Sequence, residues 1–315
     1  MAQTWTYDAP TGVYKNHEMS SNLRMAAIAD CKFIQFCKPE TGYGKKKGES
    51  ITITRVSNIS VPTSAVLVEN NRIPEDDISL STMAITVSEY GRAVPYTSLS
   101  QDLGKFDIEN TIQKKLKDQM ALVLDKAASA AFKTGKIKAE PTGASSLNID
   151  TGGTATGTAV SNLNVYHIEQ IRDYMFSTLT IPPYEGGDYM CLISTKGKRG
   201  IVSDPAWETW HKYTDPQSKY NSEIGRLENI RFVEVNNTNA LSGSLGTGSV
   251  LGEAVFFGED AVSMAVAEDP ELRAAIPQDF GRSKSVAWYG VLAFGQVWYD
   301  SANAGEARVV HVTSA

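Results

Sequence analysis

Hydrophobic residues alternate with Thr and Ser in two stretches of the N-terminal third, a period of two that is typical of half-buried β-strands. The inward-facing positions are Ile51, Ile53 and Arg55 in the first stretch, and Met83, Ile85 and Val87 in the second. Residues 49–97 are therefore predicted to form a long β-hairpin with an irregular tip. Because an isolated two-stranded ribbon is only marginally stable in water, its apolar stripe needs another surface. We expect a ribbon of this length to find that surface on another molecule.

The strongest helical pattern runs from Ile108 to Thr134, with Asp107 as the N-cap and Gly135 as the stop. Its apolar residues recur at spacings of three and four and form a single stripe. The opposite, polar side carries Lys114, Lys117, Asp118 and Asp125. At 1.5 Å per residue the helix is about 40 Å long, which is typical of a scaffold element.

The remaining segments mix short strands and helices. A short hairpin is predicted over residues 136–161, with a Gly- and Thr-rich turn at 151–158, and an amphipathic helix begins at Asn164 and ends before Pro182. Strands are predicted over 189–193, 230–235, 250–257, 285–300 and 307–312. Because helices and strands do not alternate as they do in a doubly wound sheet, the predicted fold class is α+β.

Composition excludes several classes of protein. The chain has 315 residues, 42% of them hydrophobic and 21% charged, and a net charge of −6. Proteins dedicated to DNA or RNA usually carry a basic surface, so any nucleic-acid contact is expected to be weak and local. No secretory signal is recognised, and the longest apolar stretch, 286–295, is too short to span a membrane. We expect a soluble protein made in a cytoplasm, with Cys31, Cys37 and Cys191 reduced and mostly packed.

No group of residues has the spacing of a catalytic or metal site. The histidines are scattered, at His17, His167, His211 and His311, so neither a metal nor a cofactor is expected. The carboxylate pairs Asp76-Asp77 and Glu268-Asp269 are predicted to lie in solvated turns.

One basic cluster offers an alternative reading. Lys196, Lys198 and Arg199 lie near a predicted helix start and could hold an anion close to the Gly-Thr tract. This cluster is the feature that favours a phosphate-ligand enzyme, whereas the rest of the chain favours a protein without enzymatic activity.

A series of short strings resembles the major capsid proteins of tailed bacteriophages. The strings occur in the family's order over residues 45–312, and they are Met83–Val94, Phe106–Ile108, Ile181–Tyr184, Asp204–Trp207, Glu223–Arg226, Asp279–Arg282 and Ala287–Gly290. Each string alone is weak, but their collinear succession is specific. The resemblance implies the HK97-like capsid fold. It further implies an N-terminal arm at 1–45, an extended loop at 46–98, a peripheral domain at 99–161 with its spine helix at 108–134, an axial domain at 162–262 and peripheral return strands at 263–315.

The resemblance also implies a function. Such subunits assemble into hexamers and pentamers that form an icosahedral shell around packaged double-stranded DNA in the virion. Contacts between subunits are expected at Ile51, Ile53, Arg55, Ile85, Val87, Glu69 and Arg72. The implied partners are other copies of the chain, a separate scaffolding protein, a portal, a possible decoration protein and non-specifically held DNA, with no membrane and with assembly in the host bacterial cytoplasm. The alternative function is the shell of an encapsulin-like nanocompartment.

Overall fold

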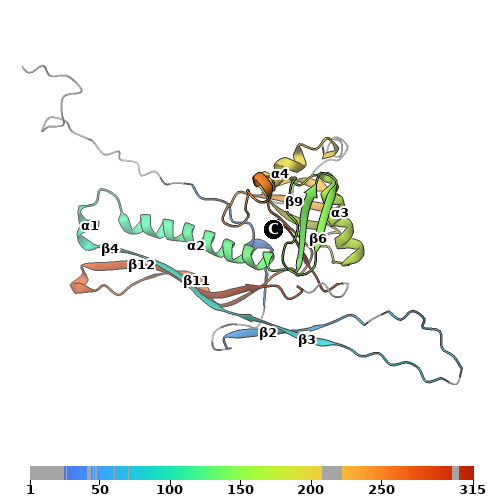
Figure 1. The fold of residues 1–315 in the computed structure, drawn as a ribbon. Helices are drawn as coiled ribbons and strands as arrows, with labels where there is room; N and C mark the ends of the chain where they lie inside the picture. The colour runs from blue at the N-terminus through green and yellow to red at the C-terminus, as the bar shows by residue number, and fades with distance from the viewer. Residues whose placement is uncertain are drawn as a thin grey trace, which may run out of the picture.

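The computed structural model describes residues 25, 27–40, 44, 46, 48–59, 61–69, 71–207, 222–299 and 305–315. Most of the expected N-terminal arm lies outside these ranges, as do Trp210 and His211. The described chain forms a globular lobe, an elongated arm that extends from the lobe, and a two-stranded ribbon that lies along the arm near the lobe and projects in the opposite direction from the arm (Figure 1).

The arm is one long helix packed along a four-stranded sheet. Helix α2 (Ile108–Lys133) begins at Asp107, whose side chain accepts a hydrogen bond from the N–H of Asn110 at 3.1 Å. The predicted helix and its N-cap are thus confirmed. The sheet has the order β1-β11-β12-β4, and its strands are β1 (Lys38–Pro39), β4 (Ser88–Thr97), β11 (Ser263–Ala274) and β12 (Ser283–Gly295). Leu116 of α2 packs against Val286 and Trp288 of β12, and the short helix α1 (Ser98–Leu103) joins β4 to α2.

Two sequence predictions in this region are wrong. Residues 88–97 do not belong to the hairpin, because β4 pairs with β12 along its whole length, from Ser88 opposite Leu292 to Thr97 opposite Ser283. Glu268-Asp269 does not lie in a solvated turn but within β11, at a register shift between Val266 and Glu271. A local pattern does not reveal which distant strand will supply the hydrogen bonds, and a bulge lets a strand carry residues that are typical of turns.

The lobe is built on a seven-stranded sheet of order β6-β5-β13-β10-β7-β9-β8. Its strands are β5 (Ile137–Gly143), β6 (Ser146–Asp150), β7 (Tyr189–Ser194), β8 (Glu223–Leu227), β9 (Ile230–Val235), β10 (Ala254–Phe257) and β13 (Val309–Val312). The sheet therefore places β5, β6 and β13 in the lobe, although their residues fall within the expected peripheral ranges 99–161 and 263–315. The helices of the lobe are α3 (Val165–Asp173), which continues into the π-helical turn η2 (Tyr174–Thr178), and α4 (Thr195–Val202).

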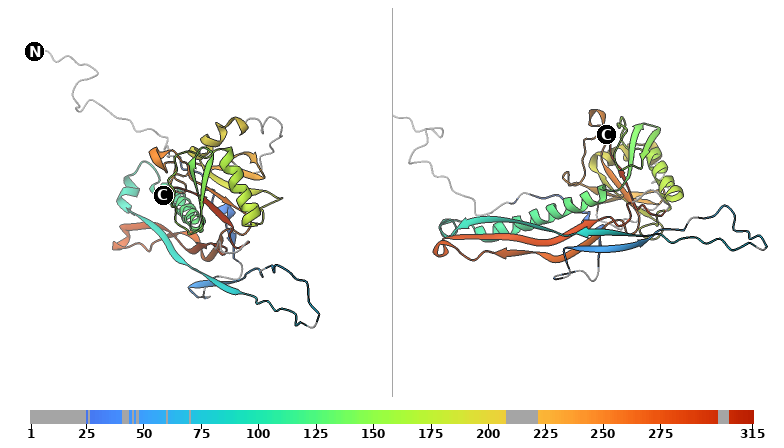
Figure 2. Two further views of the ribbon diagram at one scale, coloured as in Figure 1. Left: turned by 45° about the vertical axis from the view of Figure 1, so that its right-hand side comes forward. Right: turned by 60° about the horizontal axis from the view of Figure 1, so that its bottom comes forward.

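Both faces of the lobe sheet are buried, so its central strands are continuously apolar. Cys191 and Ile193 of β7 lie in one core with Ile168 of α3. Met190 and Leu192 lie in a second core, on the side of α2. The sheet is thus held between α3 and the C-terminal end of α2 (Figure 2).

Asp125 corrects the predicted polar side of α2. It is fully buried, because residues 27–40 pass over the helix. Its carboxylate accepts hydrogen bonds from the N–H of Phe33 at 2.8 Å and from Nδ2 of Asn237 at 3.0 Å. Burial raises the pKa of Asp125 although these hydrogen bonds oppose the rise. The helix therefore has a second buried face near its C-terminal end.

Candidate assembly surfaces

The base of the ribbon packs on its own chain. Strands β2 (Ser50–Val56) and β3 (Leu80–Thr86) pair antiparallel, with Ile51 opposite Ile85. Ile85 is only 3% exposed and lies in a small core with Ala265 of β11 and Ala293 of β12, and Ile51, Ile53 and Val87 pack around it. Gly295 allows this close approach, since a Cβ at that position would lie 2.9 Å from Cγ1 of Ile85.

The structure thus supplies, within the chain, the surface that we expected another molecule to provide for this stripe. Arg55 is also engaged internally: its Nη1 donates to the carbonyl of Val297 at 3.0 Å and its Nε to Oγ of Ser81 at 2.7 Å. Its guanidinium lies 4.9 Å from the ring centroid of Tyr299. These residues already have partners within the chain, so their role in a contact between subunits stays a prediction.

We expect Ile85→Ala to release the ribbon base from the sheet. Removing a buried Ile side chain costs about 2–5 kcal/mol, and the loss should appear as local opening because the ribbon packs on the sheet through a small core. Hydrogen exchange of the β2 and β3 amides should accelerate at least tenfold. The control is Val66→Ala, at a position that is 84% exposed. Unchanged exchange in Ile85→Ala would contradict the internal role of the stripe.

The ribbon tip, defined as residues 58–79, presents a different surface. Every described residue in it is exposed and lies outside the helices and strands. Seven of the exposed residues are large and hydrophobic, namely Ile59, Val61, Val66, Leu67, Val68, Ile73 and Ile78. The tip projects away from both the arm and the lobe (Figure 2). Scattered exposed apolar residues are ordinary, but a contiguous group marks an interaction surface.

Glu69 and Arg72 lie in this tip and not beside the Ile51 stripe. Both are exposed, and Arg72 forms an ion pair with Glu75. The tip also carries Asp76 and Asp77, so acidic residues alternate with apolar ones along this part of the chain. The seven candidate contact residues thus divide into an internal group of five on the ribbon base and an exposed group of two at the tip.

A buried charged cluster joins the arm to the lobe. We call Lys133, Lys138, Glu253 and His311 the Glu253 cluster. The two carboxylate oxygens of Glu253 lie 2.9 Å from Nζ of Lys133 and 2.7 Å from Nε2 of His311. Nζ of Lys138 lies 3.2 Å from Nδ1 of His311 and donates to the carbonyl of Lys133 at 2.6 Å. The cluster therefore ties the end of α2 to β5 and β13.

The hydrogen bonds of the cluster limit its protonation. When Lys138 is an ammonium it can only donate, and Nδ1 of His311 then accepts from it while Nε2–H donates to Glu253. Burial alone would raise the pKa of Glu253, but the hydrogen bond from His311 and the charge of Lys133 outweigh it and lower the pKa to about 2. Burial lowers the pKa of His311. The cluster thus contains an ionised carboxylate and a neutral imidazole. Sequence spacing alone could not identify it, because its members come from three segments that are distant in sequence, residues 133–138, Glu253 and His311.

The alternative anion site is in part occupied by the chain itself. Lys198 lies in α4 and forms an ion pair with Glu234 at 2.6 Å. In the Gly-Thr tract, the N–H of Gly152 donates to Asp150 and that of Gly157 to Glu140, each at 2.6 Å. Backbone N–H groups that already bind carboxylates are not available to cradle a phosphate.

Other chemistry is limited in the part of the chain that the structure describes. No group of three or more His, Cys, Asp or Glu residues in these ranges could hold a metal ion. None of the helices in the same ranges is both long and apolar enough to cross a membrane. The three cysteines are free thiols, and burial raises the pKa of Cys37 to about 12.

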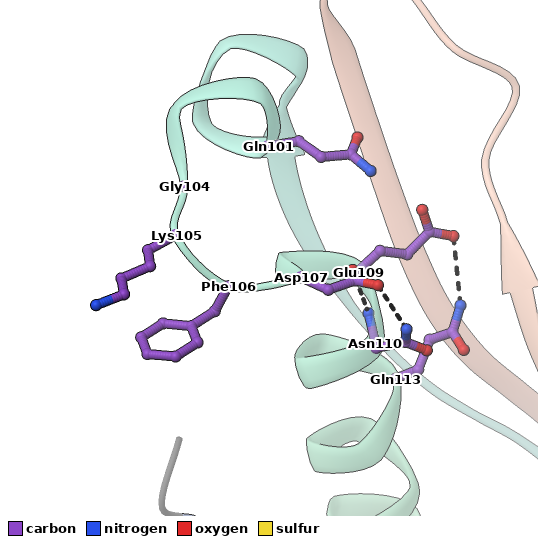
Figure 3. Close-up of a pocket in the computed structure, with 8 residues that line it drawn as sticks. All are labelled: Gln101, Gly104, Lys105, Phe106, Asp107, Glu109, Asn110 and Gln113. Atoms are coloured by element: carbon purple, nitrogen blue, oxygen red, sulfur yellow. Dashed lines mark hydrogen bonds between the residues drawn. The ribbon is translucent and has the colours of Figure 1, made fainter. Parts of the chain in front are cut away.

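A polar cavity of about 460 Å³ lies at the end of the arm that is far from the lobe, between α1 and the start of α2. Gln101, Asp107, Glu109 and Gln113 are among the residues that line it (Figure 3). Its polar groups largely bond to one another, since Asp107 accepts from Asn110 and Glu109 from Gln113. The cavity thus lies at the capped start of α2. The described residues that line it do not form a catalytic arrangement.

The comparisons with known proteins bear on the fold. No protein-family model and no curated protein matches the chain. Among solved structures, the capsid of Helicobacter pylori bacteriophage KHP30 matches with a TM-score of 0.71 and 13% identity over 96% of each chain. The capsid of cyanophage Pam1 matches with a TM-score of 0.71 and 12% identity over 98% of this chain and 100% of that one. The capsid of Ralstonia phage GP4 matches with a TM-score of 0.67 and 16% identity over 99% and 98%. Arm, lobe and ribbon are all included in these matches, and the chain therefore has the HK97-like fold of phage capsid proteins.

Proposed function

We propose that this chain is a phage major capsid protein, which assembles into hexamers and pentamers and forms an icosahedral shell around double-stranded DNA. The observation that carries the proposal is the exposed apolar ribbon tip, on a chain that matches a phage capsid structure over 96% of its length. A segment that buries none of its seven large hydrophobic residues within its own chain is suited to bury them on another subunit.

The proposal assigns roles to the parts of the fold. The arm with α2 corresponds to the peripheral domain and its spine helix, the lobe to the axial domain at the centre of each capsomer, and the ribbon to the extended loop. DNA is enclosed by the shell and touched non-specifically on the inner face, which agrees with a net charge of −6. We further propose a separate scaffolding protein and a portal during assembly in the host bacterial cytoplasm, and a possible decoration protein outside. The protein has no enzymatic role in this proposal.

The test is electron microscopy and sedimentation of the purified protein, expressed with and without the other head proteins of its source. Closed shells or capsomers of five and six subunits are expected. Particles that contain nucleic acid would support the viral role, whereas particles that contain a protein cargo would indicate a nanocompartment shell. A monomer that persists at high concentration and in the presence of the other head proteins would contradict both.

A further inference from the structure

A cavity of about 240 Å³ lies between the base of the ribbon and the lobe. Val56 lines it from the end of β2, Thr180 from the segment that follows η2, and Trp298, Glu306 and Arg308 from the segment between β12 and β13. We call it the Arg308 cavity. Its walls come from three parts of the chain that are distant in sequence.

The guanidinium of Arg308 is half-buried in this cavity without an acceptor. Within the described ranges it has neither a hydrogen-bond acceptor nor an ion-pair partner, and its Nε is buried. It lies 5.2 Å from the ring centroid of Trp298. Burial lowers the pKa of Arg308, although the charges of Asp260 and Glu259 oppose the fall. A guanidinium carries five N–H donors in a planar fork that matches an oxyanion, and the described chain supplies no such group.

Thr180 brings a second donor to the same cavity. It ends η2 with a φ of 48°, a left-handed conformation in which Gly is the usual residue and a β-branched residue is an outlier. The backbone is held on both sides, because the N–H of Ile181 donates to the carbonyl of Met175 at 3.0 Å and the N–H of Gly305 to that of Leu179 at 2.6 Å. The Thr180 hydroxyl has no hydrogen-bond partner in the described ranges. Strain of this kind is concentrated at functional sites.

The charge and size of the cavity select the kind of oxyanion. Glu306 is only 6% exposed and lines the cavity together with Arg308, so a ligand with two negative charges is disfavoured beside it. A carboxylate has one negative charge and two oxygens that fit the guanidinium fork, whereas a phosphate group has a charge of about −1.5 to −2 at pH 7. The cavity is large compared with the about 30 Å³ that one water molecule occupies in the liquid, so it has room for such a group.

We propose that Arg308 and Thr180 bind a carboxylate group in the Arg308 cavity, with the guanidinium fork and the Thr180 hydroxyl as donors. This group belongs either to a small organic acid or to an Asp or Glu side chain of a second copy of the chain. Both sources supply the acceptor that Arg308 does not find in its own chain. The site goes beyond the proposed shell function, since the first source does not require assembly.

Thermal unfolding of the full chain tests the site, with acetate as the probe. About 100 mM sodium acetate should raise the unfolding temperature of the parent by about 2 °C or more relative to sodium chloride at equal ionic strength, because a ligand of the folded state stabilises it. Arg308→Gln should abolish this shift, and Arg308→Lys, which keeps the charge but loses the fork, should reduce it. Lys117→Gln removes an exposed positive charge of α2 and is the matched control, which should keep the full shift. Arg308→Gln should fold, because it removes no hydrogen bond or ion pair of the described chain.

Sedimentation of the same variants identifies the source of the carboxylate. If a second copy supplies it, Arg308→Gln should raise the concentration needed for association by about tenfold or more, and acetate should compete with association of the parent. If acetate stabilises the parent and Arg308→Gln associates normally, the source is a small organic acid.

The proposal is overturned if acetate gives no shift and Arg308→Gln associates as the parent does, since the cavity then holds water alone. This result would leave the shell function intact, because association of the parent tests that function separately. A parent that never associates would contradict the shell function and the second-copy source, and the acetate shift would still decide whether the site binds a carboxylate.

Discussion

Shortening the ribbon should abolish shell formation while leaving the subunit folded. The variant replaces residues 59–78 by a single glycine, so that Asn58-Gly becomes a two-residue turn between Ser57 and Ser79. The N–H of Ser57 already donates to the carbonyl of Ser79 at 3.0 Å, and Asn-Gly is favoured in such turns. Every described residue that is removed is exposed, so the unfolding temperature should change by no more than about 3 °C. Sedimentation should show no shell-sized particles.

A full-length control separates the length of the tip from its apolar character. In this control Val61, Val66, Leu67, Val68, Ile73 and Ile78 are replaced by Ser, and the acidic residues are kept. If burial on a neighbour drives assembly, the control should fail as the shortened variant does, because each large apolar side chain contributes about 1.5–3 kcal/mol when it is fully buried. Shells formed by the shortened variant at the parent's yield would refute the assigned role of the ribbon tip.

Glu253→Gln should destabilise the subunit strongly, by about 3–5 kcal/mol, because removing one partner of a buried ion pair leaves the others uncompensated. The side chain of Glu253 is only 6% exposed and has Lys133 and His311 as partners. Chemical denaturation of the two proteins at pH 7 measures the difference. Asp260→Asn is the matched control: its partner Lys38 is 61% exposed, and such surface pairs contribute about 1 kcal/mol or less.

The pH dependence of the parent tests the same cluster without a substitution. The folded protein holds the pKa of Glu253 at about 2, below its ordinary 4.5. A lowered pKa means that the carboxylate stabilises the fold fully above pH 4.5 and that this contribution is lost as the pH falls towards 2. The difference corresponds to about 3 kcal/mol. Protonation of His311 is also disfavoured in the folded state, so it acts in the same direction below pH 6.5. Parallel stability curves for parent and Glu253→Gln between pH 5 and 2.5 would contradict this assignment.

Elements that depend on neighbouring residues could be predicted from the sequence. Helix α2 was delimited almost to the residue because its cap and its apolar stripe are local signals. Strand β7 followed from a continuous apolar run, and β9 from a stretch whose apolar residues are interrupted by Arg231 and Glu234. The α+β class followed from the irregular succession of helical and strand patterns, and the capsid fold followed from the collinear strings that resemble the phage capsid family.

Elements whose environment is made by distant segments could not be predicted in this way. Residues 88–97 were assigned to the predicted hairpin, but their partner is β12, about 200 residues later in the chain. Asp125 has the helical phase of an exposed residue, yet residues 27–40 cover it. The same limit applies to the assembly surfaces. The stripe around Ile85 required an apolar partner, and only the three-dimensional structure identified that partner as β11 and β12.

The place of β13 has a consequence for synthesis of the protein. This strand follows every other strand in the chain, yet it lies in the interior of the lobe sheet, between β5 and β10. During translation, one edge of β5 and one edge of β10 stay unpaired until residues 309–312 are synthesised. Unpaired strand edges can pair with strands of other chains and lead to aggregation. His311 arrives with the same strand, so the Glu253 cluster is completed in the same step. A translation product that stops before β13 therefore lacks the strand that joins β5 to β10, and it lacks a complete Glu253 cluster. Such a fragment cannot form the complete lobe sheet.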